Sequence, residues 1–317
     1  MSVDTRAVSW PTLVPEEPIE AGPLAVYPLF NPVAAPAEPG YVLLEPALKA
    51  DLIEVTEVSE GGRVPTIALI NNGALPILAL QGQELVGAKQ NRTLNVSFLA
   101  PHGRTEIPVT CVERGRWGYR GERFGAGTVE HHNLRAMKAE MVYAAAKRAP
   151  KRKRGYDVDQ IAVWNEVDRE SARHDVRSAT SALNEVYAAP MIASRMHQFD
   201  AVNDLPEGTV GVAVAIGGEL VAAEFMESPE AFASVWPILR KSYALSALNR
   251  KEKAAPARMQ AQTFASWPGG SVPEIGEAVG LGEDVRWEGR GFLAAGLVHE
   301  GRIVHGALFA RAGENGA

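Results

Sequence analysis

Short apolar runs separated by turn residues dominate the first third of the chain. The runs YVLLEP, LIEVTEV, PTIALI and ALPILAL are each bounded or interrupted by Gly, Pro or Asn. Apolar runs of about four to eight residues bounded in this way are typical of β-strands, since a helix needs a longer periodic segment. We therefore predict a largely antiparallel β-meander over residues 23–127, with hairpin turns at residues 59–62 and 101–103.

The pattern changes at Thr128, where helical features replace strand features. Thr128 is a suitable N-cap, and Pro150 ends the helix that follows it. A basic run, residues 147–154, then leads to a second helix that starts near Asp157 or Asp159. We predict a helical insert over residues 128–200. We interpret the basic run as a solvated linker, which a protein partner or a nucleic acid could also contact.

The last third of the chain contains two hairpin patterns on either side of a helix. In GTVGVAVAIGGELVAAEF, two apolar runs flank Gly217 and Gly218, which suit a two-residue turn. Ser228 and the proline after it predict the start of the helix. The final hairpin turns at residues 300–301. We expect the two hairpins of this half, residues 205–311, to join the early sheet.

These patterns together predict an α+β protein. We expect one domain over residues 23–317, preceded by a flexible arm of residues 1–22 that is rich in Pro and Glu. The composition, 46% hydrophobic and 22% charged, is that of an ordinary globular protein. One cysteine excludes an internal disulfide, and the sequence shows neither a secretory signal nor an uninterrupted membrane span. We therefore expect a cytoplasmic protein without a membrane partner.

Four hydrogen-bonding side chains lie together between two apolar strands in the stretch GQELVGAKQNRTLNVS. Lys89 and Arg92 could hold an anion such as phosphate, and Gln90 and Asn91 could contact a sugar or a base edge. Glu84 could balance the cations or act as a general base. We expect this loop at the edge of the sheet, as one wall of a pocket. The same residues also suit a hydrogen-bonded turn that pins two strands together.

A second polar stretch, CVERGRWGYRGERFGAGT, follows. On a strand, Cys111 and Glu113 share one face, so Cys111 is a candidate nucleophile and Glu113 a candidate base. A lone strand cysteine is more often a small core residue, and Glu113 could simply pair with Arg116. Trp117 could stack on a ligand, although a packed lid or core residue is the simpler interpretation.

Glycines lead from this second stretch towards the first predicted helix. Residues 125–128 would bring the free N–H groups of a helix N-terminus to an arginine-rich loop, which suits an anion, although a solvated loop is the competing interpretation. His131 and His132 follow and point in different directions, so we predict no metal site. No motif identifies a cofactor, and the net charge of −6 argues against a nucleic-acid partner.

Four segments of the chain have a distinctive order: LAVYPLF, then QGQELVGAKQNRTLNVS, then IPVTCVERGRW, then the VGVAVAI segment. This order resembles a bacterial family, the ADP-ribosylglycohydrolase- and rhodanese-phosphatase-associated protein domain. The resemblance extends from about Leu24 to Ala310. It implies an association with ADP-ribose and NAD-derived metabolism, and it carries no established reaction or catalytic residues.

Two hypotheses of different classes follow. In the first, the protein binds or processes a phosphorylated nucleotide-sugar metabolite such as ADP-ribose. The ligand contacts would be Lys89, Gln90, Asn91, Arg92, Arg116 and Trp117. Glu84, Glu113 or Cys111 would carry any chemistry, and the sequence leaves open whether the protein is an enzyme. In the second, it is a non-catalytic scaffold or interaction domain in which the same residues form a structural network.

Overall fold

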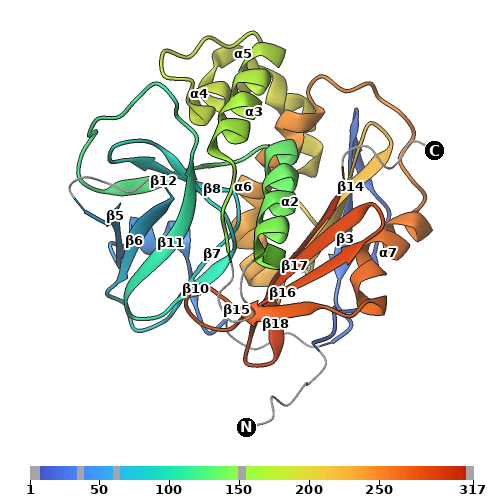
Figure 1. Cartoon of the computed structure of the whole chain (residues 1–317). Helices are drawn as coiled ribbons and strands as arrows, with labels where there is room; N and C mark the ends of the chain where they lie inside the picture. The colour runs from blue at the N-terminus through green and yellow to red at the C-terminus, as the bar shows by residue number, and fades with distance from the viewer. Residues whose placement is uncertain (1–7, 34–38, 60–64, 149–154, 312–317) are drawn as a thin grey trace. The chain divides into compact units, whose positions relative to one another are not determined.

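The computed structural model describes residues 8–33, 39–59, 65–148 and 155–311, and the chain divides into two compact units (Figure 1). Unit 1 contains Met1–Pro39, Gln198–Glu277 and Gly282–Ala317, and unit 2 contains Gly40–His197 and Ala278–Leu281. Both units combine mostly antiparallel sheets with helices, which confirms the α+β class. The single domain proposed for residues 23–317 stays a prediction.

Unit 1 is built on a nine-stranded antiparallel sheet. Its order is β1-β3-β13-β14-β18-β17-β16-β15, and β2 pairs with β3. The strands are β1 (Val14–Pro15), β2 (Ile19–Ala21), β3 (Leu24–Phe30), β13 (Gly211–Ile216), β14 (Glu219–Met226), β15 (Glu274–Glu277), β16 (Glu283–Gly289), β17 (Phe292–His299) and β18 (Arg302–Ala310).

Both late hairpins form as predicted. Gly217 and Gly218, with φ values of 62° and 83°, turn β13 into β14, as a two-residue turn with positive φ at both positions requires. Glu300 and Gly301 turn β17 into β18. The first of these hairpins pairs with the early strand β3, and none of its strands joins the sheet formed by the described residues 53–129.

The helices of unit 1 include α6 (Pro229–Ala247), α7 (Arg258–Ser266), η2 (Trp267–Gly270) and most of η1 (His197–Val202). Ser228 caps α6, since its side chain accepts from the backbone N–H of Ala231 at 3.2 Å. The core of this unit includes Trp10, whose ring meets that of Phe225 edge-on at 5.0 Å. The arm predicted for residues 1–22 is therefore packed from Trp10 onwards, because its apolar residues complete this core.

Unit 2 contains a six-stranded sheet that curls towards closure. Its order is β12-β8-β9-β11-β6-β5, and a bridge between Thr56 and Arg123 connects its two edges (Figure 1). The strands are β5 (Ile53–Glu57), β6 (Thr66–Asn71), β8 (Gln83–Gly87), β9 (Arg92–Leu94), β11 (Gly103–Cys111) and β12 (Phe124–Val129). A separate three-stranded sheet contains β4 (Val42–Leu43), β7 (Ile77–Ala79) and β10 (Phe98–Ala100).

Two turn predictions in unit 2 had different outcomes. The turn at residues 101–103 does not form a hairpin, because β10 pairs with β7 while β11 pairs with β6 and β9. The turn at residues 59–62 lies mostly outside the described residues, although its flanking strands β5 and β6 do pair.

The helices of unit 2 are α1 (Leu44–Lys49), α2 (His132–Arg148), α3 (Gln160–Arg173), α4 (Leu183–Ala188) and α5 (Pro190–Met196). Asp159 caps α3 as predicted, but α2 begins at His132 and not at Thr128. Thr128 belongs to β12, where it lies at a register shift between Ala126 and Val129, which both pair with β8. Most of the basic linker, residues 149–154, lies outside the described residues. No described helix has the length and apolarity that a bilayer crossing requires.

Candidate functional site

The first polar stretch forms the tip of the β8–β9 hairpin in unit 2. Leu85 pairs with Arg92, and residues 88–91 connect the strands. The hairpin lies inside the sheet, between β12 and β11, and not at its edge as expected. The second polar stretch covers the tip: the N–H of Gly118 donates to the carbonyl of Lys89 at 3.2 Å, and that of Arg120 to the carbonyl of Ala88 at 2.9 Å. This cover explains why the four polar residues are buried.

Glu113 and Arg116 form a buried ion pair that fastens the covering segment to the hairpin. Nε and Nη2 of Arg116 donate to the two carboxylate oxygens of Glu113 at 2.9 and 2.6 Å. Nη1 donates to the carbonyl of Ala88 at 2.6 Å. Glu113 also accepts from the N–H of Asn91 at 3.1 Å and from the hydroxyl of Thr180 at 3.0 Å. The guanidinium of Arg116 is thus occupied by the protein itself.

Arg92 is fully buried at the start of β9. Its Nη1 donates to Oε1 of Gln90 at 2.9 Å and contacts Sγ of Cys111, while Nη2 lies 3.5 Å from Oε1 of Glu57 on β5. Within the described part of the chain, neither carboxylate oxygen of Glu57 has a hydrogen bond, and the same holds for Nη2 and Nε of Arg92. Unused buried polar atoms of this kind are rare in structural cores and are more common at sites that bind something.

Glu57 borders a cavity of about 760 Å³. The other lining residues are Thr56, Ser59, Tyr119, Gly121 and Glu122. This volume lies in the range of about 300–1,000 Å³ that small-molecule sites occupy. The cavity therefore brings solvent close to the buried Glu57–Arg92 pair.

Two exposed aromatic rings, which we call the aromatic platform (Trp117 and Tyr119), lie beside this pair. Their exposed fractions are 52% and 51%. Nζ of Lys89 lies 5.5 Å from the ring centroid of Trp117 and 5.1 Å from that of Tyr119, and Cζ of Arg92 lies 5.6 Å from that of Trp117. Trp117 is therefore neither a core residue nor a closed lid, and at least one cation lies over each ring.

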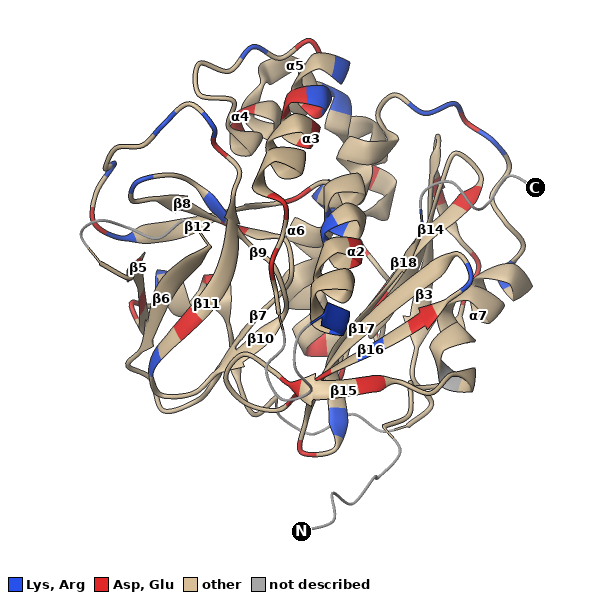
Figure 2. Cartoon of the chain, viewed as in Figure 1, with Lys and Arg blue, Asp and Glu red and all other residues tan. Residues whose placement is uncertain are grey.

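The loop between β11 and β12 carries four arginines, and the basic positions of this loop are blue in Figure 2. Arg114 pairs with Asp168 at 3.4 Å and Arg123 with Glu54 at 3.0 Å, both at exposed positions. Arg120 comes directly after Tyr119, its side chain is 56% exposed, and its only ion pair among the described residues is a 4.0 Å approach to Glu113. Lys89 and Arg120 are thus the cations of this loop region that are best placed for an anionic ligand.

The three candidate catalytic groups differ in pKa. Burial raises the pKa of the Cys111 thiol to about 11, even though Arg92 opposes the shift, so the thiol is protonated at neutral pH. Burial would also raise the pKa of Glu113, but the hydrogen bonds from Arg116, Asn91 and Thr180 hold it below its usual value. Neither group therefore has the properties of a nucleophile or base that works near pH 7.

Glu84 differs from both. Burial raises its pKa to about 8, the nearby Glu113 and Glu130 add to the shift, and the backbone N–H of Thr128, which donates to Oε2 at 3.2 Å, opposes it. A carboxyl with a pKa near 8 is protonated at neutral pH and can exchange its proton there. Among the three candidates, Glu84 alone has a pKa suited to proton transfer.

A further buried ion pair, which the sequence analysis missed, lies behind the hairpin. Nζ of Lys138 on α2 donates to Oε1 of Glu130 at 2.7 Å, and both side chains are fully buried. Lys138 also donates to the hydroxyl of Thr93 on β9 at 3.0 Å. Helical periodicity could have identified Lys138, since it comes four residues after the buried Leu134.

Glu57 and Tyr119 were also missed. Strand alternation places Glu57 on the same face as the buried Ile53 and Val55, so the pattern of LIEVTEV already indicated a buried carboxylate. No comparable pattern marks Tyr119, because it lies in an irregular loop. In the structure, all the predicted ligand contacts meet around the β8–β9 tip, and Glu84 lies further along β8. Their roles in binding or catalysis stay predictions.

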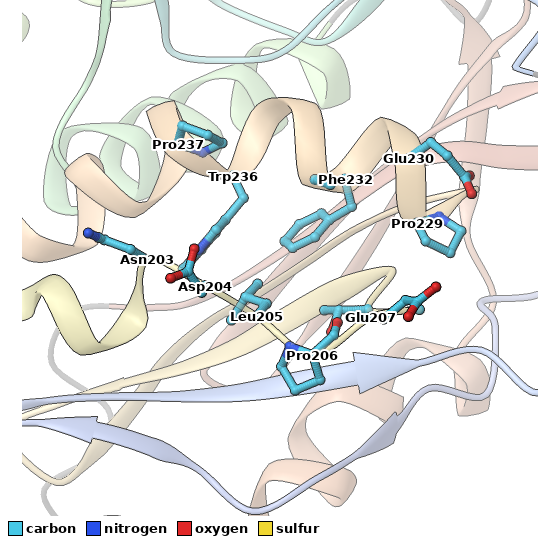
Figure 3. A pocket seen from close by; sticks show the side chains of 13 residues that line it. Asn203, Asp204, Leu205, Pro206, Glu207, Pro229, Glu230, Phe232, Trp236 and Pro237 are labelled. Carbon is cyan, nitrogen blue, oxygen red and sulfur yellow. The ribbon is translucent and has the colours of Figure 1, made fainter.

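A second hollow lies in unit 1 (Figure 3). Its volume is about 540 Å³, and its apolar lining includes Phe232 and Trp236 of α6. Its charged lining residues are Asp204, Glu207 and Glu230, with no lysine or arginine among the lining residues that the structure describes. This hollow would repel an anionic ligand. The cavity of unit 2 is also lined by acidic residues, Glu57 and Glu122, but Lys89 lies beside the aromatic platform there, which makes the platform the better candidate for a phosphorylated ligand.

Comparison with known proteins identifies the family. A family model described as the ARG and Rhodanese-Phosphatase-superfamily-associated Protein domain matches residues 12–309. The chain therefore belongs to this family, as its motifs predicted. No curated protein and no solved structure was found to match it.

Proposed function

We propose that this member of the ARG and Rhodanese-Phosphatase-superfamily-associated Protein domain family binds a phosphorylated nucleotide-sugar of the ADP-ribose class, in the cytoplasm, at the aromatic platform and the adjoining cavity. The observation that carries the proposal is the exposure of Trp117 and Tyr119 directly above the buried cations Lys89 and Arg92. The family's description, which links it to ADP-ribosylglycohydrolase, supports this ligand class.

The two parts of such a ligand match the two parts of the site. An adenine ring stacks on an exposed aromatic side chain, a contact that contributes about 1–3 kcal/mol per base. Phosphate oxygens need cations. Lys89 lies beside the same rings, and Arg120, which follows Tyr119 in the chain, has a side chain that is 56% exposed. Arg116 is excluded from this role because its donors are already used on Glu113 and on backbone carbonyls.

Glu84 is the group that we propose for proton transfer if the bound sugar is processed. Its raised pKa of about 8 favours it over Glu113 and Cys111. The family description assigns no reaction, so binding is the primary proposal. The scaffold hypothesis is retained as the alternative that the binding experiment decides.

Titration of the protein with ADP-ribose tests the proposal. We expect the wild-type protein to bind ADP-ribose and to unfold at a higher temperature in its presence. At a ligand concentration of 100 times the dissociation constant, the free energy of unfolding should rise by about 2.7 kcal/mol. Trp117→Ala should weaken binding by roughly 10-fold or more, because the stacking contact is lost. Isothermal titration calorimetry with ADP-ribose, AMP, ribose 5-phosphate and pyrophosphate would show which part of the ligand carries the affinity.

Trp164→Ala is the matched control, since Trp164 also has a cation over its ring, Arg114 at 5.7 Å, but does not belong to the aromatic platform. It should bind as the wild type does. The proposal fails if the wild-type protein binds none of these compounds, or if Trp117→Ala binds ADP-ribose with unchanged affinity. Failure of the first kind would support the scaffold hypothesis.

A further inference from the structure

A histidine that precedes α2 and two glutamates of α3 meet inside unit 2. Glu166 and Glu170 lie four residues apart on α3, so both project from one face of that helix towards His131, which directly precedes α2. One ligand atom from each of the three side chains lies within 4.8 Å of the other two. The three residues are buried. We call this group the His131 cluster (His131, Glu166 and Glu170).

His131 itself has no partner that explains its position. Its side chain is fully buried, and neither ring nitrogen has a hydrogen bond among the described residues. Burying an unsatisfied polar group costs about 1–3 kcal/mol. A structural role would be filled better by an apolar side chain of similar size, so the unused nitrogens point to something that binds there.

We propose that the His131 cluster is a binding site for a divalent transition-metal ion of the zinc or manganese class. One imidazole nitrogen and two carboxylate oxygens form a mixed N/O donor set that suits these ions, and calcium or magnesium would favour oxygen ligands alone. The proposal is independent of the ADP-ribose site, since it shares no residue with the aromatic platform or its cavity.

The geometry requires only a small closure. Ligand atoms around a tetrahedral ion with bonds of about 2.1 Å lie roughly 3.4 Å apart. The upper separation of 4.8 Å therefore has to shrink by about 1.4 Å, which rotation of the carboxylate side chains can supply. The carboxylate of Glu170 is held in place by a second histidine, because Nε2 of His174 lies 2.9 Å from its Oε1.

Two arginines now neutralise the carboxylates. Nη1 of Arg169 lies 3.0 Å from Oε2 of Glu166, and Nη1 of Arg173 contacts Oε2 of Glu170. Their side chains are 67% and 41% exposed, so they reach the cluster from the solvent side. Each arginine can return to water when an ion takes over its glutamate, and the fourth coordination position would then be left for solvent or a ligand.

Metal titration of the full-length, chelator-treated protein tests the proposal. We expect one equivalent of Co²⁺ to give visible d–d absorption bands, and one equivalent of Zn²⁺ to displace it and to raise the unfolding temperature. Glu166→Gln and His131→Ala should each weaken Zn²⁺ affinity by about 100-fold or more, because each removes a ligand. Circular dichroism would establish that each variant is folded before its titration.

Matched controls are Glu140→Gln, an exposed glutamate on α2, and His102→Ala, an exposed histidine. Both should bind Zn²⁺ within about twofold of the wild type. If His131→Ala does not fold, Glu166→Gln and Glu170→Gln carry the test, since both keep the shape of the side chain. Absence of a stoichiometric Co²⁺ spectrum in the wild type, or unchanged Zn²⁺ affinity in the Glu166 and Glu170 variants, would overturn the proposal.

Discussion

Replacing Arg116 with alanine should lower the free energy of unfolding by about 3–5 kcal/mol, because it leaves the carboxylate of Glu113 buried without its main partner. The side chains of Arg116 and Glu113 are only 10% and 0% exposed, so water cannot take over the lost hydrogen bonds easily. The same substitution also removes the contact to the carbonyl of Ala88 that holds the β8–β9 tip. Urea unfolding at pH 7, followed by circular dichroism, measures the loss.

Arg114→Ala is the control for this effect. Arg114 pairs with Asp168 at 3.4 Å, but the two side chains are 55% and 41% exposed. Exposed pairs contribute little, so the control should lose less than about 1 kcal/mol. If Arg116→Ala unfolded like the wild type and lost only ADP-ribose affinity, Arg116 would be a ligand contact, as the sequence suggested, and not a structural clamp.

The comparison of Arg116 with Trp117 shows where sequence reasoning stops. The sequence identified both residues, together with the β8–β9 stretch that they meet. It could not divide their roles, because that division depends on which side chain closes on the protein and which stays open to solvent. Arg116 turns inward onto Glu113, three residues before it, while Trp117 turns outward.

Local patterns predicted the two late hairpins well, but they failed for the turn at residues 101–103 and for the secondary structure of the glycine-rich segment. Gly217 and Gly218 specify a turn by their own backbone freedom, so that prediction needed no tertiary information. The sequence of residues 125–128 suggests the approach to a helix. In the structure these residues belong to β12, which pairs with β8, and the helix starts later at His132. The glycines that were predicted to lead into an anion site at that helix N-terminus therefore lie in a strand and do not adjoin the helix.

Sequence analysis did not find the His131 cluster because His131 lies 35 or more residues from the two glutamates in the chain. Considered as a neighbouring pair, His131 and His132 gave no reason to expect a ligand set. Only the packing of α3 against the start of α2 brings Glu166 and Glu170 to His131. Contacts of this kind are decided by the tertiary fold and leave no short-range pattern.

Replacing Glu84 with glutamine should remove a pH dependence of stability that the wild-type protein has. In the folded wild type, the pKa of Glu84 is raised from 4.5 to about 8, because burial and the nearby Glu113 and Glu130 disfavour the charged carboxylate. Hydrogen bonds from Thr128 and Asn91 oppose this shift. Between these two values the folded state holds a proton that the unfolded state releases. Stability conferred by this group is therefore fully present below about pH 4.5 and is lost as the pH rises towards 8.

The expected loss of stability through Glu84 is large enough to measure by urea unfolding. A shift of one pKa unit corresponds to about 1.4 kcal/mol, so the wild type should lose on the order of 3 kcal/mol between pH 5 and pH 8 through Glu84 alone. Glu84→Gln keeps the neutral shape, and its stability should exceed that of the wild type at pH 8 but match it at pH 5. Urea unfolding at both pH values, with Glu140→Gln as the exposed control, gives the difference directly. An equal difference between variant and wild type at both pH values would mean that Glu84 titrates like an ordinary carboxyl, and it would remove Glu84 as the proposed group for proton transfer near neutral pH.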